Sequence, residues 1–226
     1  MTALALGGSS SSYVKKNWRW NSRDPRIQLY LKDDQNLKNE GLTSAQAQAA
    51  ITNAANSWDD VVAQNLFADG TTVIVDANKN TDNPYDGFNV HAWKSLFDAP
   101  GAIAYSRTRT NAPTVDGYLT VYESDVSYNS DVSWSTMGTE GALYYAGSPI
   151  DLHTVAMDEL GHTLGLGDLY NLPDASPAKS DLNQVMNRYN DVQRMLGNGD
   201  RAGVQALYAL PGEGPFYGMS ATYTKA

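Results

Sequence analysis

The sequence has no cysteine among its 226 residues, which excludes disulfide bonds, thiol catalysis and cysteine ligands to a metal. Cations are also scarce, because 16 Lys and Arg face 25 Asp and Glu, for a net charge of −9. Nucleic acids and anionic membranes attract clustered Lys and Arg, so we expect neither as a partner. Long hydrophobic runs are missing, and we therefore expect no transmembrane helix.

The composition suggests a secreted, extracellular protein, because it has 14 tyrosines, many Asn and Ser residues and few lysines. The opening residues, MTALALGGSSSSYVKK, have neither a basic n-region nor a long apolar h-region, so we do not expect them to act as a signal peptide. The length fits one large domain or two subdomains with a substantial core. We expect a monomer.

Hydrophobic periodicity predicts an α+β fold. Ile27, Leu29 and Leu31 alternate with polar residues, as in a strand with one buried face. Thr43 and Gln46 form a capping-box pattern at the start of a long amphipathic helix. Further strands are expected at 71–76, 102–110 and 117–129, and helices at the stretch ending at Gly165 and at 200–210. We expect loops or turns at 32–41 and 111–113, and a loop or short helix around His91 and Trp93.

Residues 151–170, DLHTVAMDELGHTLGLGDLY, carry the pattern with the clearest chemistry. Positions four apart on a helix lie about 40° from one another, so Asp158 and His162 project from one face, with Glu159 beside them. Gly165 favours a left-handed turn that ends the helix and brings Asp168 back toward the same point. Three ligands with an open fourth position are what a catalytic zinc requires. The pattern therefore predicts a metal held by Asp158, His162 and Asp168.

No other histidine takes the place of Asp158. His153 lies nine residues before His162, or about 900° of helix rotation, and therefore on the opposite face. His91 is distant in the sequence, and nothing fixes its location. Either Asp158 is the first ligand, or that ligand is missing.

The motif DELGHTLGLGD (158–168) resembles H-E-L-G-H-x-L-G-L-x-H of the metzincin metallopeptidases, and most closely that of the matrixin-like proteins. Only the first and last ligands differ. The segments 18–58, PGAIAYS (100–106), 117–129 and GDRAGVQALYAL (199–210) are similar to other parts of that fold. Met186, in a polar loop after Asp168, resembles the methionine of the Met-turn that lies beneath the metal.

This resemblance implies one catalytic domain over 1–226, with an upper subdomain at about 13–167 and a lower one at about 168–226. It implies a twisted mixed sheet, a long backing helix, an active-site helix and a small C-terminal subdomain ending in a helix. It further implies a secreted zinc-dependent endopeptidase, in which zinc would polarise the scissile carbonyl and acidify the attacking water, and Glu159 would be the general base.

The resemblance also places the peptide or protein substrate along an edge strand. The residues expected to contact it there are Ala102, Ile103, Ala104 and Tyr105. Tyr189, three residues after Met186, is expected to line a specificity pocket beside the metal.

Asp158 leaves three interpretations open. As a zinc ligand, its negative charge would make bound water less acidic, so affinity and activity would be low. Alternatively no metal binds, and the protein holds peptides without cutting them. In the third interpretation the carboxylate favours a harder ion, such as calcium or manganese, at the same place.

Two other groups of acidic residues could in principle carry chemistry. The loop with Asp76, Asn78, Asn80 and Asp82 begins like a calcium loop, but Thr81 and Gly87 stand where that pattern has Gly and Glu. Calcium binding and a solvated turn both stay open there, and a structural domain with calcium-binding acidic loops is a weaker alternative. A glycosidase using Glu123 and Asp125 has no spacing argument behind it.

Overall fold

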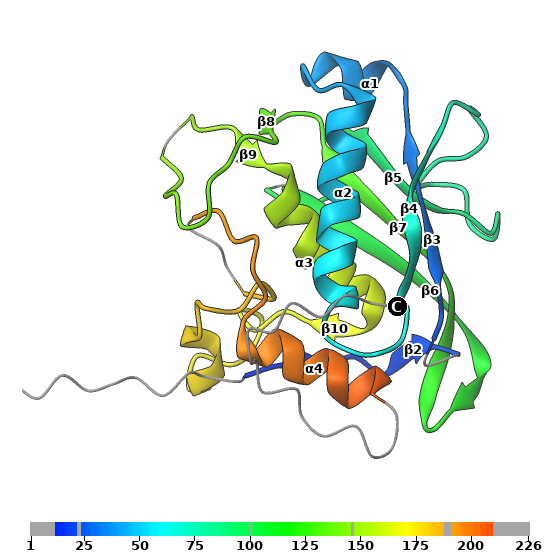
Figure 1. Ribbon diagram of the computed structural model, residues 1–226, viewed down its shortest axis with the longest axis vertical. Coiled ribbons are helices and arrows are strands. Elements are labelled where there is room, and N and C mark those ends of the chain that lie inside the picture. The colour runs from blue at the N-terminus through cyan, green and yellow to red at the C-terminus, as the bar shows by residue number, and fades with distance from the viewer. Residues whose placement is uncertain (1–11, 22–23, 100, 146, 188–190, 210–226) are drawn as a thin grey trace, which may run out of the picture.

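The computed structural model describes residues 12–21, 24–99, 101–145, 147–187 and 191–209. The α-helices in these ranges are α1 (Gln35–Asn39), α2 (Ser44–Asp59), α3 (Leu152–Leu164) and α4 (Asn198–Tyr208), and the one 3₁₀ helix described is η1 (Pro177–Ser180). The strands are β1 (Val14–Lys15), β2 (Trp18–Trp20), β3 (Ile27–Lys32), β4 (Phe67–Ile74), β5 (Asn89–Lys94), β6 (Ala104–Val115), β7 (Tyr118–Asn129), β8 (Trp134–Ser135), β9 (Ile150–Asp151) and β10 (Leu166–Gly167). The architecture is mixed α+β, as predicted (Figure 1).

A six-stranded, mostly parallel sheet forms the centre of the fold. Its order is β2-β7-β5-β3-β4, and β6 pairs with β7. The pairs β2/β7, β7/β5, β5/β3 and β3/β4 are parallel, whereas β6/β7 is antiparallel. Among the described strands β6 pairs with β7 alone, so it forms an edge of the sheet.

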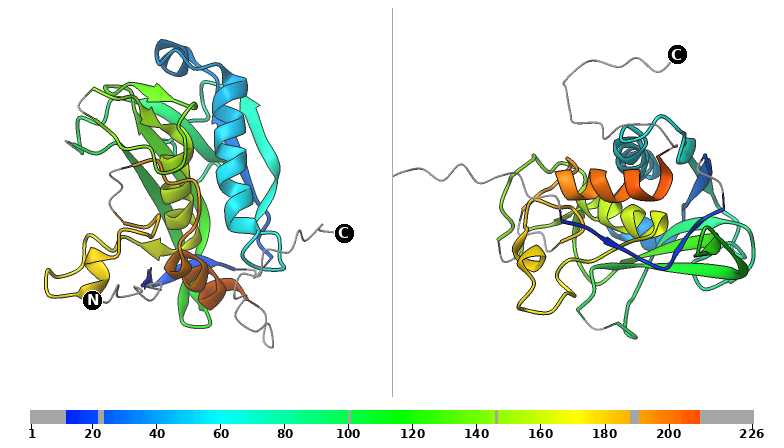
Figure 2. Two further views of the ribbon diagram at one scale, coloured as in Figure 1. Left: turned by 60° about the vertical axis from the view of Figure 1, so that its left-hand side comes forward. Right: turned by 90° about the horizontal axis from the view of Figure 1, so that it is seen from below.

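The helices α2 and α3 cross one face of this sheet (Figures 1 and 2). Thr43 caps α2 and forms the predicted capping box with Gln46. The buried face of α2 includes Trp58, whose indole N–H donates a 2.9 Å hydrogen bond to the carbonyl oxygen of Met157 in α3. The long backing helix is thereby fixed to the helix that carries the motif.

The first strand follows the predicted alternation. Ile27, Leu29 and Leu31 are at most 2% exposed, and the residues between them are partly exposed. The parallel neighbour β4 begins at Phe67, earlier than predicted. The Asp59 carboxylate accepts hydrogen bonds from the backbone N–H groups of Leu66 and Phe67, which ties the start of β4 to the end of α2.

The prediction of a loop or short helix at His91 and Trp93 is wrong, because both residues lie in β5. This central strand is buried along almost its whole length, including His91, so it lacks the polar–apolar alternation of a half-exposed strand. Parallel strands covered on both faces have no such alternation, and the polar residues here look like a loop in the sequence.

Two expected loops also contain regular structure. Strand β6 continues through 111–113 to Val115, and a register shift between Asn111 and Thr114 accommodates this segment. A bulge of this kind keeps a strand paired where the local sequence favours a turn. The charged segment 32–41 contains α1, which is capped by Asp34 and buries Leu37.

The last helix fixes the loop that carries Met186. Helix α4 begins two residues before the predicted start at 200. Its buried Asp200 accepts hydrogen bonds from the backbone N–H groups of Val185 (2.8 Å) and Met186 (3.2 Å). One hydrophobic core includes Trp58 of α2, Leu160 of α3 and Leu207 of α4. In the described part of the chain, no helix is long and apolar enough to span a membrane.

Candidate metal centre

A capping side chain fixes the start of helix α3, and a left-handed glycine fixes its end. The Asp151 carboxylate caps its first turn by accepting a 2.9 Å hydrogen bond from the backbone N–H of Thr154. Gly165 ends the helix in the left-handed conformation, with φ of 100°. A Cβ at this position would lie 2.6 Å from the carbonyl oxygen of Trp18, so only glycine fits. The turn expected at Gly165 is confirmed.

This turn brings three side chains together. One ligand atom from each of Asp158, His162 and Asp168 lies within 4.8 Å of the other two. In the described residues this is the only group of three or more His, Asp or Glu with such geometry. His162 Nε2 lies 3.1 Å from Asp168 Oδ1. The arrangement is suited to hold a metal ion.

The donor set fits a divalent cation. Asp158 is 7% exposed, and its buried Oδ1 has no hydrogen-bond partner among the described residues. A buried carboxylate oxygen without a donor is costly unless a cation satisfies it. The other ring nitrogen of His162, Nδ1, donates to the carbonyl oxygen of Leu166 at 3.0 Å, which directs Nε2 into the group. Two carboxylates and an imidazole are accepted ligands of zinc.

Two of the three side chains, Asp158 and His162, have raised pKa values, whereas the hydrogen bond and charge of His162 lower that of Asp168 against the effect of burial. Burial raises the pKa of Asp158 well above its usual range, and the charge of His162 offsets this only in part. Burial alone would lower the pKa of His162, but its hydrogen bond with Asp168 and the charges of Asp158 and Glu159 raise it to about 10. Since metal ligands must be deprotonated, a cation that binds here has to displace these protons.

Glu159 lies next to the group, and its carboxylate Oε2 accepts a 2.7 Å hydrogen bond from Ser106 Oγ of β6. The side chain is 4% exposed. Burial raises its pKa, and the charge of His162 and the Ser106 hydrogen bond lower it in part. Glu159 is therefore held between the edge strand and the metal-ligand group.

A cavity of about 790 Å³ contains the group. One wall is the segment 101–108, another comprises Asp158, Glu159 and His162 of α3, and Lys16, Trp18, Asp168, Tyr170 and Asn187 complete the lining. Lys16 belongs to the N-terminal segment whose strand β1 pairs with β10 beside Asp168. Burial, Asp168 and Asp158 together raise the pKa of the Tyr170 phenol.

The four residues expected to contact substrate all line this cavity. Ala104 and Tyr105 open β6, and Ala102 and Ile103 directly precede it. The carbonyl oxygen of Ile103 accepts a 2.9 Å hydrogen bond from the backbone N–H of Asn129. Because backbone groups alternate in direction along an antiparallel strand, those of Ala104 and of Ser106 point away from β7. Along the edge of β6 beside Asp158, His162 and Asp168, these backbone groups therefore have no partner strand among the described residues.

Met186 is buried directly beneath the helix. A Cβ added to Gly161 of α3 would collide with Met186 Sδ, so the motif glycine makes room for the methionine. The structure thus places Met186 next to the helix turn between Asp158 and His162. Tyr189 lies outside the described residues.

The acidic loop before β5 has other contacts. Asp82 forms ion pairs with Lys94 (2.5 Å) and Arg107 (3.4 Å). The side chains of Asp76 and Asn80 accept hydrogen bonds from backbone N–H groups within the loop, those of Asn78 and Asp82. The side-chain oxygens of Asp76 and Asn80 therefore stabilise turns within the loop, and that of Asp82 pairs with Lys94 and Arg107. Calcium binding in this loop stays an untested prediction.

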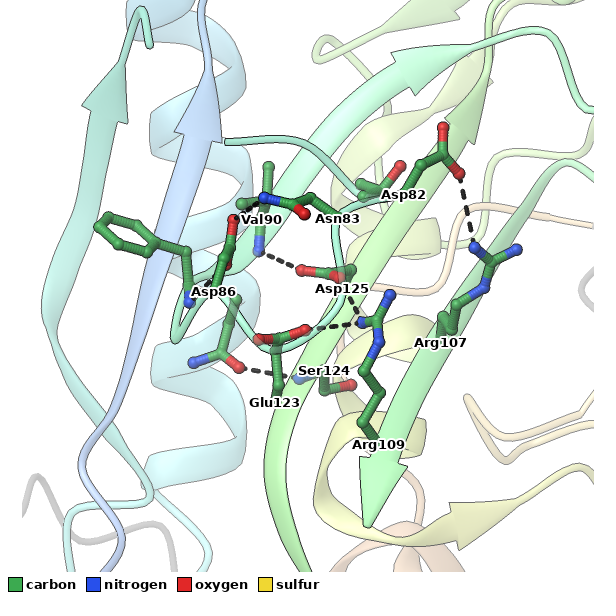
Figure 3. Close-up of polar contacts among 12 residues, drawn as sticks. Asp82, Asn83, Asp86, Val90, Arg107, Arg109, Glu123, Ser124 and Asp125 are labelled. Carbon is green, nitrogen blue, oxygen red and sulfur yellow. Dashed lines mark hydrogen bonds and ion pairs between the residues drawn. The ribbon is translucent and has the colours of Figure 1, made fainter. Parts of the chain in front are cut away.

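Glu123 and Asp125 flank Arg109 on β6 (Figure 3). Both carboxylates are at most 1% exposed. Glu123 also accepts hydrogen bonds from the backbone N–H groups of Tyr85 and Gly87. Glu123 thus holds the loop before β5 onto the sheet, and Asp125 accepts a hydrogen bond from the backbone N–H of Val90 within β5. Both carboxylates are buried in these contacts and are closed to a sugar substrate.

Sequence patterns did not point to Ser106, Lys16 or Tyr170. Ser106 is 53 residues from Glu159, and no local spacing relates the two. A comparison of the sequence with protein-family models found no match, and a search of curated proteins found none either.

Proposed function

We propose that this protein is a zinc-dependent endopeptidase that resembles the matrixin-like metzincins. The observation that carries the proposal is the convergence of Asp158, His162 and Asp168 beside Glu159, in a cavity bounded by an open strand edge. Asp158, His162 and Asp168 would hold the metal. The chemistry that zinc supplies when bound in such a site is Lewis acidity, which polarises a carbonyl oxygen and makes water more acidic.

Glu159 has the position required of a general base. Its carboxylate lies beside the ligand group and faces the cavity, so it would take a proton from the attacking water and deliver it to the leaving amine. Burial raises the pKa of Glu159, which would help it hold the proton until the proton passes to the leaving amine. A carboxylate with this role needs a fixed position within hydrogen-bond reach of the water.

The edge of β6 would bind the substrate backbone. Its unpaired groups, those of Ala104 and Ser106, are available to an extended peptide, which would add a strand to the sheet. The substrate would then cross the cavity directly over α3. Secretion to the extracellular space and a monomeric state remain predictions from the sequence.

The test combines metal analysis with a peptide-cleavage assay on this chain and on Asp158→His. We expect weak zinc binding and slow cleavage before the change. The histidine variant should bind zinc about tenfold tighter or more, since losing even a hydrogen-bond partner of a ligand changes metal affinity 10- to 100-fold. A histidine variant with neither zinc nor cleavage would overturn the proposal.

A peptide-binding protein without catalysis is the second candidate. The observation that favours it is the open edge of β6, which can pair with a peptide whether or not a metal is bound. In addition, burial raises the pKa of Asp158, and the hydrogen bond with Asp168 raises that of His162 against the effect of burial, so both side chains tend to hold protons that a metal must displace. If this candidate is correct, the unmodified chain binds an extended peptide, as seen by calorimetry, but holds no stoichiometric zinc. Full cleavage activity in the unmodified chain would exclude it.

A further inference from the structure

Ser106 joins the edge strand to the carboxylate of Glu159. Its Oγ lies 2.7 Å from Glu159 Oε2 and 2.8 Å from the Glu159 carbonyl oxygen. A serine hydroxyl has one proton, so it donates to one of these acceptors at a time. The role of Ser106 therefore depends on whether its hydroxyl donates to the carboxylate or to the carbonyl oxygen of Glu159.

The carbonyl oxygen of Glu159 already accepts a hydrogen bond from a second hydroxyl, that of Thr163. Thr163 Oγ1, one helix turn further along α3, donates to the Glu159 carbonyl oxygen at 3.1 Å. Thr163 Oγ1 also lies 3.1 Å from Ser124 Oγ of β7. With the carbonyl satisfied by its own helix, the Ser106 proton is available to the carboxylate, which forms the stronger hydrogen bond when it is charged.

We propose that Ser106 is a positioning residue for Glu159, holding the carboxylate in one conformation toward the cavity. This inference rests on the proposed function, in which Glu159 transfers the proton. The contact crosses from β6 to α3, so it also fixes the base relative to the strand that would receive the substrate.

The same residue has a second connection to the substrate. The backbone N–H and C=O of Ser106 face away from β7, on the open edge, while its side chain reaches Glu159. A peptide that pairs with β6 would hold this residue in place and, through its hydroxyl, hold Glu159. Peptide binding and the placement of the base are thereby linked through one side chain.

The test uses Ser106→Ala, Ser106→Thr and a matched control, Ser127→Ala. Ser127 is a buried serine on the neighbouring β7 whose Oγ donates a 2.8 Å hydrogen bond to Thr81 Oγ1, away from the cavity. Its replacement removes a comparable hydrogen bond without touching Glu159. Kinetics are measured in this chain or in Asp158→His, whichever cleaves peptide. Crystal structures of all variants locate the Glu159 side chain.

We expect Ser106→Ala to lower kcat about 10- to 100-fold with KM within about twofold, because small misplacements of a catalytic group cost rates of that order. Ser106→Thr should restore most of kcat, and Ser127→Ala should retain it. In the crystal structures, the Glu159 side chain should occupy one conformation wherever residue 106 is serine or threonine. In Ser106→Ala it should rotate away or occupy two conformations.

Equal losses of kcat in Ser106→Ala and Ser127→Ala would overturn the inference, since a general loss of stability would then explain both. If neither this chain nor Asp158→His cleaves peptide, the proposed function fails. The crystals still decide on Ser106 in that case, because an unchanged Glu159 conformation in Ser106→Ala contradicts its positioning role.

Discussion

Asp158 and Glu159 are adjacent in the sequence and differ in their partners. Asp158 Oδ1 has no hydrogen-bond partner among the described residues, whereas Glu159 Oε2 accepts from Ser106. The first is suited to a cation and the second to a fixed orientation beside it. In the proposed function, these two buried acids would take different roles, Asp158 as a ligand and Glu159 as a base, because their surroundings differ.

Glu159→Gln tests this division at the residue scale. The amide cannot accept the proton from water, so we expect cleavage to fall about 10²- to 10⁴-fold, the range typical of a lost general base. Zinc content should stay the same, because Glu159 is not one of the three ligands. Metal analysis and a peptide assay on one preparation measure both, and loss of zinc together with activity would place Glu159 among the ligands instead.

The convergence of Asp158, His162 and Asp168 is predictable from the sequence because these residues are close together in the chain. Asp158 and His162 are one helix turn apart, and the turn at Gly165 returns the chain to Asp168 within a few residues. Ser106 was not predictable, since its contact with Glu159 depends on how a distant strand packs against the helix. Spacing rules describe one element at a time and do not contain that information.

At the element scale, the end of α3 depends on Gly165. Its left-handed conformation and its close approach to the Trp18 carbonyl oxygen both exclude a side chain. The chain then pairs with the N-terminal strand β1 through Leu166 and Gly167 before it reaches Asp168. Any shift of this turn therefore moves Asp168, the third ligand in the proposed metal site.

Gly165→Ala should destabilise the fold more than Gly141→Ala. Both glycines have positive φ, which costs an alanine about 1–2 kcal/mol. A Cβ at Gly141 meets nothing within 4 Å, whereas at Gly165 the clash should add about 1–3 kcal/mol. Urea unfolding measures the two free energies, and equal losses would show that the Trp18 contact relaxes without cost. Gly165→Ala should also weaken zinc binding, and Gly141→Ala should not.

Elements with one exposed face were predicted best. β3 and α2 show clean periods of two and 3.6 residues, so their positions follow from the sequence. The sequence around His91 and Trp93 predicts a loop or short helix instead of β5, because this strand is central and buried. The predicted strand at 102–110 is shorter than β6, because a bulge carries β6 past 111–113. In these strands tertiary pairing outweighs the local signal.

At the scale of the whole molecule, a buried histidine links stability to pH. His91 lies in the central strand, 0% exposed, with Nδ1 2.9 Å from the Tyr128 hydroxyl. Burial lowers its pKa to about 3. The unfolded chain binds a proton at His91 below about pH 6.5, whereas the folded chain does not until near pH 3. The stability that neutral His91 contributes is therefore present above pH 6.5 and lost as the pH falls.

His91→Gln should flatten this dependence. Between about pH 6.5 and pH 3 the unmodified chain should lose roughly 1.4 kcal/mol per pH unit more than the variant. Urea unfolding at several pH values gives both slopes, and the difference at pH 7 reports the packing cost of the substitution alone. Parallel slopes would mean that His91 is protonated in the folded state or reached by water.

The whole site combines distant parts of the chain. The N-terminal segment, the edge strand β6, helix α3 and the loop held by α4 all border the cavity or support it. The central claim is that Asp158, His162 and Asp168 bind one divalent ion. Its most direct test is calorimetric titration of zinc into this chain and into His162→Ala, with Asp82→Asn as a control in the acidic loop. We predict one zinc per chain, lost in His162→Ala and retained in Asp82→Asn. Absence of binding, or binding that survives the loss of His162, would contradict the claim.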